Sequence, residues 1–236
     1  MRMLKMGISG LLDHLIVFIF VVVYPSWAGY RFLQVKRGSK TLPVAYLEAA
    51  VGQWLVTLLV LAWIGVSGRV MADIGLRLDY TWSMIISLIV TAGGMAFFVI
   101  QAWTLTRSED TRQEVRRQVK KVSPIMPRTM PQLGGFLLLA ISAGICEEIL
   151  FRGFLIDYLD RYFSLVTAFL GSSIIFGLAH AYQGPKGMLQ AAVAGAVFAG
   201  LYLFSGSLLA PILLHIVVDI HGGWAGYYVS RASARD

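Results

Sequence analysis

Long apolar runs constrain the fold of this chain more than any other feature of its sequence. Seven stretches of about 20 residues carry few charges, and each is long enough to cross a bilayer as an α-helix. Outer-membrane strands would instead alternate apolar and polar residues, which these runs do not do. Apolar residues make up 57% of the chain and charged residues only 14%. The sequence therefore predicts an all-α fold, a polytopic transmembrane helix bundle.

The predicted spanning helices cover residues 11–29, 44–66, 82–105, 133–156, 163–181, 188–204 and 208–229. We expect the first to be retained and not cleaved as a signal peptide, because its apolar run is long and lacks a small-residue cleavage pattern. We divide the chain into N-terminal helices with a charged linker, residues 1–130, and a catalytic core of four helices, residues 131–236.

Basic residues are concentrated on one side of these predicted helices. Arg31, Lys36, Arg37 and Lys40 follow the first helix, and seven more Lys and Arg residues lie within 107–128. By the positive-inside rule this side is cytoplasmic, which places the N-terminus outside and the C-terminus inside. The formal net charge of +7 then belongs to membrane-flanking loops, and we predict a lipid bilayer and not a nucleic acid as its partner.

The stretch 106–131 is expected to lie outside the membrane. Its residues 109–121 fit either a short amphipathic surface helix or a solvated linker, and the sequence leaves both open. Pro124, Pro127 and Pro131 would end such a helix and lead into the next span.

Ionisable side chains inside the C-terminal spans indicate a structural or functional role, because each costs several kcal/mol in the bilayer unless it is paired or hydrated. They are Glu147, Glu148, Arg152, His180, His215 and Asp219. Glu148 and Arg152 are one helical turn apart and can form an ion pair. Glu147 points about 100° away from that face and is left unpaired by the arginine. His215 and Asp219 also lie one turn apart.

These groups together suggest a hydrolase. A carboxylate can act as a general base on water, one histidine can share the proton of that water, and a second can donate to an oxyanion. This set suffices to hydrolyse an amide without a covalent intermediate, with the water activated by Glu147 and His180. Glu147 is predicted past mid-membrane and His180 near the cytoplasmic end of its helix. Sharing one water therefore requires different helix limits or a tilted or broken helix.

Three motifs within this region resemble those of a known family. Glu-Glu-x-x-x-Arg at 147–152, Phe-x-x-x-His at 176–180 and His-x-x-x-Asp at 215–219 occur in order within apolar helices. They are similar to the motifs of the CPBP (CAAX protease and bacteriocin-processing) intramembrane endopeptidases. That family is also called Abi and includes the Ras-converting enzyme. The resemblance covers about residues 131–223.

The resemblance implies a role for each motif residue. Glu147 would be the general base, His180 would hold the water, and His215 with Asp219 would form the oxyanion hole. The supporting residues would be Glu148 and Arg152, which shape the site, and Phe176, which packs. Relatives often carry asparagine at position 219. Since an ionised aspartate cannot donate a hydrogen bond, Asp219 is either protonated or orients His215 as an acceptor.

The expected mechanism uses no cofactor, but the sequence also allows a metalloprotease. Glu147, His180 and His215 form a ligand set of the kind that binds catalytic zinc. The expected substrate is a membrane-associated protein or peptide, and processing of a leader or bacteriocin-type peptide ranks above cleavage of a prenylated CAAX-type tail. The compact chain resembles prokaryotic members of the family, so we expect an integral protein of the plasma (inner) membrane.

Two alternatives from other functional classes remain open at this stage. One is a non-catalytic membrane scaffold or immunity protein with the same fold. The other is a proton-coupled transporter that uses Glu147 and His180 as carriers. The sequence predicts no oligomeric state.

Overall fold

A computed structural model describes residues 2–120 and 122–232, with side chains for 10–120 and 122–231. Within these residues the chain is helical and contains no strand. Six helices are long and apolar enough to cross a membrane, and one further apolar helix is shorter. The predicted all-α bundle is thereby confirmed, with one span of the predicted seven shortened.

The first half of the chain forms three long apolar helices and a surface helix. Its elements are α1 (Arg2–Phe18), the π-helix η1 (Ile19–Val23), α2 (Tyr24–Lys36), α3 (Leu42–Val66), the 3-10 helix η2 (Met71–Ile74), α4 (Trp82–Arg107) and α5 (Glu109–Val119). Pro25 lies in the first turn of α2, immediately after the π-helix. A proline lacks an N–H and crowds the carbonyl four residues earlier, which accounts for the wider turn there.

The second half carries the residues singled out above. Its elements are η3 (Ser123–Ile125), α6 (Met130–Glu147), the π-helix η4 (Glu148–Leu155), α7 (Ile156–Asp160), α8 (Leu165–Ala179), η5 (Ala181–Gln183), α9 (Gly184–Ser205) and α10 (Leu209–Ala232). The start of α6 is set by Thr129 and that of α8 by Ser164, whose hydroxyls accept from backbone N–H groups of the first turn.

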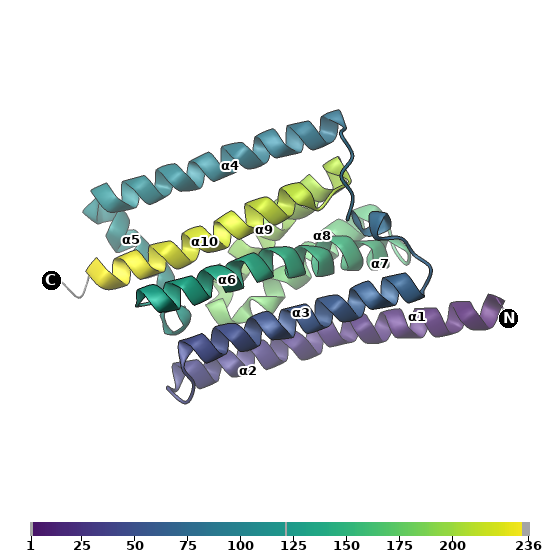
Figure 1. Cartoon of the computed structure of the whole chain (residues 1–236), viewed down its shortest axis with the longest axis horizontal. Helices are drawn as coiled ribbons and strands as arrows, with labels where there is room; N and C mark the ends of the chain where they lie inside the picture. The colour runs from purple at the N-terminus through teal and green to yellow at the C-terminus, as the bar shows by residue number, and fades with distance from the viewer. Residues whose placement is uncertain (1, 121, 233–236) are drawn as a thin grey trace.

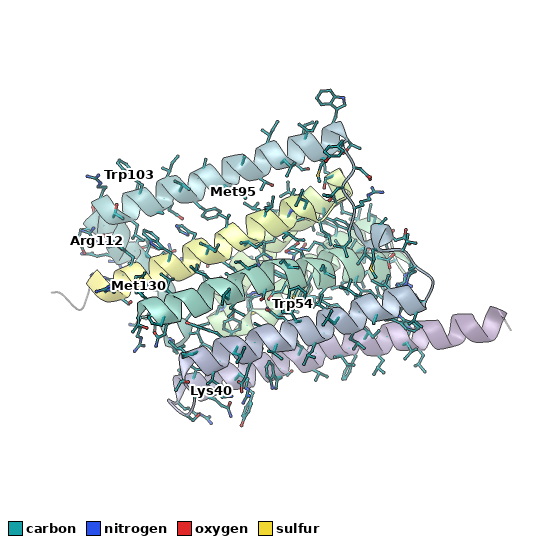
Figure 2. All side chains as sticks on the ribbon, viewed as in Figure 1. Lys40, Trp54, Met95, Trp103, Arg112 and Met130 are labelled. Atoms are coloured by element: carbon teal, nitrogen blue, oxygen red, sulfur yellow. The ribbon has the colours of Figure 1, made fainter. Side chains whose placement is uncertain are left out.

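Helix α6 occupies the middle of the bundle. It packs against α3 on one side and α10 on the other, while α10 also contacts α4 and α9 (Figure 1). Apolar side chains project from the ribbons on many sides (Figure 2), including exposed Leu55 and Leu58 on α3 and Ile89 on α4. Such exposure of large apolar side chains suits contact with lipid tails.

The charged linker forms a helix, which decides between the two readings of the sequence. Helix α5 begins at Glu109, next to Ser108, whose hydroxyl accepts from the Thr111 N–H. It ends at Val119, and the predicted end at Lys121 lies outside the described residues. A hydrogen bond from Arg112 lowers the pKa of the exposed Glu109 carboxyl. The division of the chain at residue 130 stays a prediction.

Helix α8 differs from the prediction in a way that matters for the site. Its 15 residues rise about 22 Å, less than the roughly 30 Å of a bilayer core. The chain leaves the helix at His180 and turns through η5 into α9. His180 therefore lies at the end of its helix, as predicted, but α8 is too short to cross the bilayer core. The cytoplasmic position of this end stays a prediction.

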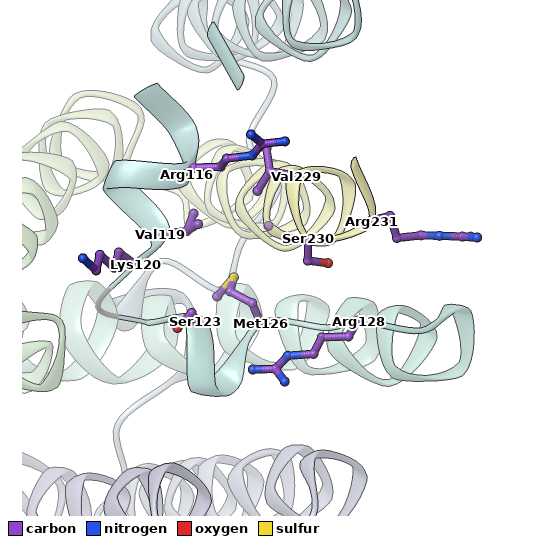
Figure 3. A pocket seen from close by; sticks show the side chains of 10 residues that line it. Arg116, Val119, Lys120, Ser123, Met126, Arg128, Val229, Ser230 and Arg231 are labelled. Atoms are coloured by element: carbon purple, nitrogen blue, oxygen red, sulfur yellow. The ribbon is translucent and has the colours of Figure 1, made fainter. Parts of the chain in front are cut away.

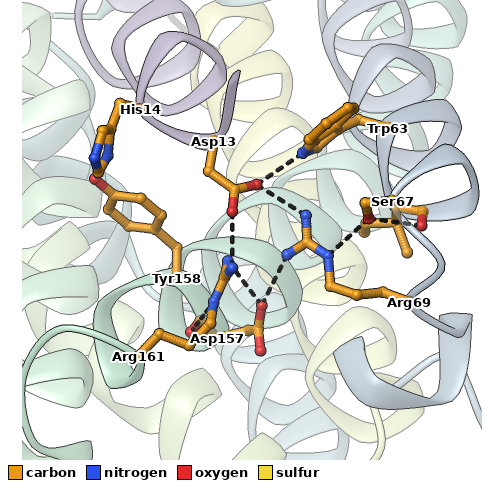
Figure 4. Close-up of polar contacts among 9 residues, drawn as sticks. Asp13, His14, Trp63, Ser67, Arg69, Asp157, Tyr158 and Arg161 are labelled. Carbon is orange, nitrogen blue, oxygen red and sulfur yellow. Dashed lines mark hydrogen bonds and ion pairs between the residues drawn. The ribbon is translucent and has the colours of Figure 1, made fainter. Parts of the chain in front are cut away.

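A partly buried ion cluster joins α1, the segment after α3, and the end of α7 (Figure 4). Asp13 is 2% exposed and accepts from Arg69 at 2.8 Å, Arg161 at 2.7 Å and the Trp63 indole at 2.7 Å. Both arginines also contact Asp157, each at 3.2 Å. Because two carboxylates face two guanidinium groups, the cluster balances its own charge.

We expect Asp13→Asn to destabilise the protein. Removing the buried anion leaves both partly exposed guanidinium groups with Asp157 as their shared carboxylate partner, a change that costs about 2 kcal/mol of unfolding free energy. The measurement is the apparent melting temperature in detergent. Asp79→Asn is the matched control, because its pair with Arg77 is about half exposed and such pairs contribute little. Equal melting temperatures of the two variants would contradict the claim that the ion cluster stabilises the protein.

Candidate active site

The two adjacent glutamates lie at the junction of an α-helix and a π-helix. Helix α6 ends at Glu147, and the π-helix η4 begins at Glu148. All eight residues of η4 are buried. The wider turn is supported from a neighbouring helix, since the Ser172 hydroxyl donates to the Phe151 carbonyl at 2.8 Å. Such π segments inside α-helices are frequent at functional sites.

Glu148 is the centre of a fully buried polar trio. Its Oε1 accepts from Arg152 Nη1 at 2.8 Å and from His215 Nδ1 at 2.7 Å. The side chains of all three are at most 4% exposed. The ion pair suggested by the sequence is present, and it has a third member from α10 that the spacing alone did not predict.

Aromatic rings and a glycine enclose the guanidinium of this trio. Arg152 lies over the ring of Phe176 at 4.2 Å and that of Phe198 at 5.2 Å, and donates to the Gly195 carbonyl at 3.2 Å. A Cβ at Gly195 would meet both the Phe176 ring and this guanidinium within 3.3 Å. Phe176 therefore packs, as expected, and also faces the cation directly.

Glycines allow the helices of the site to approach closely. A Cβ at Gly144 of α6 would overlap Ile216 of α10, including its backbone nitrogen. A Cβ at Gly177 of α8 would lie 2.8 Å from the Met188 carbonyl of α9. Small residues at helix interfaces let backbones approach in this way in membrane proteins.

Glu147 is half-buried and is held from a helix that the sequence motifs do not include. Gln53 of α3, itself 5% exposed, donates from Nε2 to Glu147 Oε1 at 2.8 Å. The other oxygen, Oε2, makes no hydrogen bond with any described residue. Arg152 pairs with Glu148 and not with Glu147, as expected, and Gln53 is a partner of Glu147 that the spacing did not predict. A lone amide within the apolar run 44–66 was the signal that could have identified Gln53.

His180 uses ring nitrogen Nδ1 for a hydrogen bond within the protein, which leaves Nε2 able to contact a water. Its Nδ1 is 2.8 Å from the Phe176 carbonyl, an acceptor, so Nδ1 carries the proton. In the neutral ring Nε2 is then an acceptor for a water proton. The ring packs 4.7 Å from that of Phe176 and 6.0 Å from that of Tyr182.

Asp219 lies close to the glutamates and the histidines of the site. Its Oδ2 lies 3.7 Å from Nε2 of His215, which is too long for a hydrogen bond. The carboxyl group also interacts electrostatically with Glu147, Glu148 and His180. The structure therefore gathers all six ionisable residues predicted from the sequence. Glu147, His180 and Asp219 are half-buried, whereas Glu148, Arg152 and His215 are buried.

The zinc alternative finds no support in the arrangement of donors. Among the described residues, no three His, Cys, Asp or Glu side chains come together as a metal-ligand group. Nδ1 of His215 is engaged by Glu148 and Nδ1 of His180 by a backbone carbonyl, so Nε2 is the nitrogen of each ring that could bind an ion.

The comparison with known families agrees with this geometry. Residues 129–221 match the family model described as type II CAAX prenyl endopeptidase Rce1-like, and this segment contains both glutamates, both histidines and Asp219. No curated protein and no solved structure matches the chain. Residues 129–221, the segment that carries the site, are thus similar to the Rce1-like family of type II CAAX prenyl endopeptidases.

Proposed function

We propose that this protein is an intramembrane endopeptidase that hydrolyses a peptide bond with water activated by Glu147 and His180. The observation that carries the proposal is the half-buried Glu147, fixed at one oxygen by Gln53 and unpaired at the other. An oriented carboxylate with an unengaged oxygen is what a general base for water requires. The family match supports a protease.

In the proposed reaction Glu147 removes a proton from a water that also donates to Nε2 of His180. The hydroxide oxygen attacks the carbonyl carbon of the substrate, and the π electrons move to the carbonyl oxygen to give an oxyanion. Glu147 then delivers its proton to the leaving nitrogen as the C–N bond breaks, giving a carboxylic acid and an amine. The water supplies both the new hydroxyl oxygen and the transferred proton.

The oxyanion would be stabilised by His215 and Asp219. Nδ1 of His215 donates to Glu148, so Nε2 has a proton to donate only when the ring is doubly protonated. Glu148 is the countercharge that such an imidazolium needs. Asp219 contributes a donor only in its protonated form.

The substrate class follows from the membrane location. We propose a membrane-associated protein or peptide, with the prenylated CAAX-type tail favoured by the family match and a leader or bacteriocin-type peptide as the second class. The orientation, with the C-terminus cytoplasmic, is likewise proposed. The charged helix α5 and the end of α10 lie at one end of the bundle, opposite the start of α1 (Figure 1).

Glu147→Gln is expected to abolish cleavage because the amide cannot accept the proton of water. The measurement is hydrolysis of quenched prenylated and unprenylated peptides by the purified full-length chain in detergent, with and without a chelator. Activity should fall by about a thousandfold or more in the variant and persist with the chelator.

Glu114→Gln on the exposed surface of α5 is the matched control and should keep full activity. If the wild-type protein binds the peptides but does not cleave them, the proposed protease activity is overturned and the scaffold alternative is favoured. Loss of activity with the chelator would favour a metal mechanism.

Gln53→Leu is expected to lower kcat by about ten- to a hundredfold with little change in KM, because Gln53 positions the base and does not touch the substrate. Trp54→Phe is the control, since it removes another hydrogen bond between α3 and α6, from Trp54 to Ser142. If both variants lose activity only in proportion to melting temperature, Gln53 has a structural role alone.

Asp219→Asn is expected to retain cleavage, because an asparagine amide donates a hydrogen bond without needing a proton from solvent. Asp219→Leu should lower kcat by about a hundredfold, the usual effect of losing one oxyanion donor. Initial rates at saturating peptide test this pair. Equal, large losses in both variants would show that the negative charge of Asp219 is required.

A further inference from the structure

A second site lies well away from the glutamates, at the end of the bundle where the basic residues gather. A pocket of about 800 Å³ is bounded by α5, the connector between α5 and α6, and the last turns of α10. Four cationic side chains line it: Arg116, Lys120, Arg128 and Arg231. Figure 3 shows them arranged around Met126, which lies near the middle. No acidic residue occurs in the described lining.

The same pocket has an apolar part. Val119 of α5 and Val229 of α10 line it together with Met126. Gly226 of α10 lets Met126 lie close, because a Cβ there would come within 2.6 Å of the sulfur. The pocket therefore combines several positive charges with an apolar patch, a combination that one ligand with a charged head and an apolar body would satisfy.

The position of the pocket along the membrane normal indicates where that ligand comes from. The candidate span of α10 ends at Arg231, that of α4 ends at Arg107, and that of α6 begins at Met130. The pocket thus lies level with the ends of the spanning helices, where lipid headgroups are found. Guanidinium groups match phosphate oxygens well, and basic pockets between helices at this level bind anionic headgroups.

We propose that this pocket binds the phosphate-bearing headgroup of an anionic membrane lipid. The cationic side chains contact the phosphate, and the apolar patch contacts the glycerol esters and the first methylene groups of the chains. One of the cations is already oriented, since Arg231 donates from Nη1 to the Tyr227 hydroxyl at 2.9 Å. A free phosphate ion would use the charges but leave the apolar patch without a partner. The proposal is independent of the protease activity.

The test is a lipid titration of the purified full-length chain in detergent, followed by native mass spectrometry. Phosphatidylglycerol is the anionic probe, and phosphatidylcholine with the same acyl chains is the neutral one. Each basic residue near an anionic surface contributes a factor of about five to affinity. Lys120→Gln/Arg128→Gln should therefore weaken phosphatidylglycerol binding about 25-fold and leave phosphatidylcholine binding unchanged. Arg128→Gln alone should give about fivefold.

Arg107→Gln/Arg117→Gln is the matched control. It removes the same charge from the same end of the bundle, but neither residue lines the pocket, and the Arg117 side chain is 77% exposed. An equal loss in the control would show a diffuse electrostatic effect and overturn the site. Equal wild-type affinity for the two lipids would also overturn it. Complete displacement of phosphatidylglycerol by equimolar inorganic phosphate would identify a phosphate-ion site and overturn the lipid assignment.

Discussion

The buried carboxylate of Glu148 is the interaction on which the arrangement of the site depends. A charge without solvent contact inside a bilayer-spanning bundle must be compensated by the protein itself. Arg152 compensates it from the same segment, and His215 adds a hydrogen bond from α10. The register between α6 and α10 is therefore fixed by hydrogen-bond geometry and not only by apolar packing, which has little directional preference in lipid.

Fixing Glu148 also fixes its neighbour. Consecutive helical residues point about 100° apart, so a carboxylate locked toward α10 directs Glu147 to a different face. There Gln53 of α3 holds one oxygen, and the other remains unengaged. One short stretch of backbone thus supplies a structural carboxylate and a reactive one, and their different burial separates the two tasks.

The sequence predicted most of the fold because the spans are marked by composition and the helix starts by local chemistry. Thr129 and Ser164 cap helices that begin within a few residues of the predicted limits. The end of α8 at Ala179 lies two residues before the predicted limit, but hydropathy did not show that its 15 residues are too few to cross the bilayer core. Hydropathy reports what a segment is made of, not where the chain turns inside the bundle.

The sequence predicted side-chain contacts within one helical turn. It did not predict contacts whose two partners come from different helices. Glu148 with Arg152 follows from a spacing of four residues, whereas His215 binding Glu148 joins residues 67 positions apart. Gln53 lies outside the segment that matches the family model, on a helix that carries no motif. Its role depends on α3 packing against α6, which only the tertiary structure defines.

The site contains more carboxyl groups than permanent positive charges. Three carboxyl groups, two imidazoles and one guanidinium lie within electrostatic reach of one another. With every carboxyl ionised and both imidazoles neutral, the cluster would carry two negative charges that no described cation there balances. In a poorly solvated environment such an excess of negative charge is costly. Neighbouring carboxyl and imidazole groups can hold and pass a proton, which suits the proposed reaction, in which water gives up a proton and the leaving nitrogen takes it.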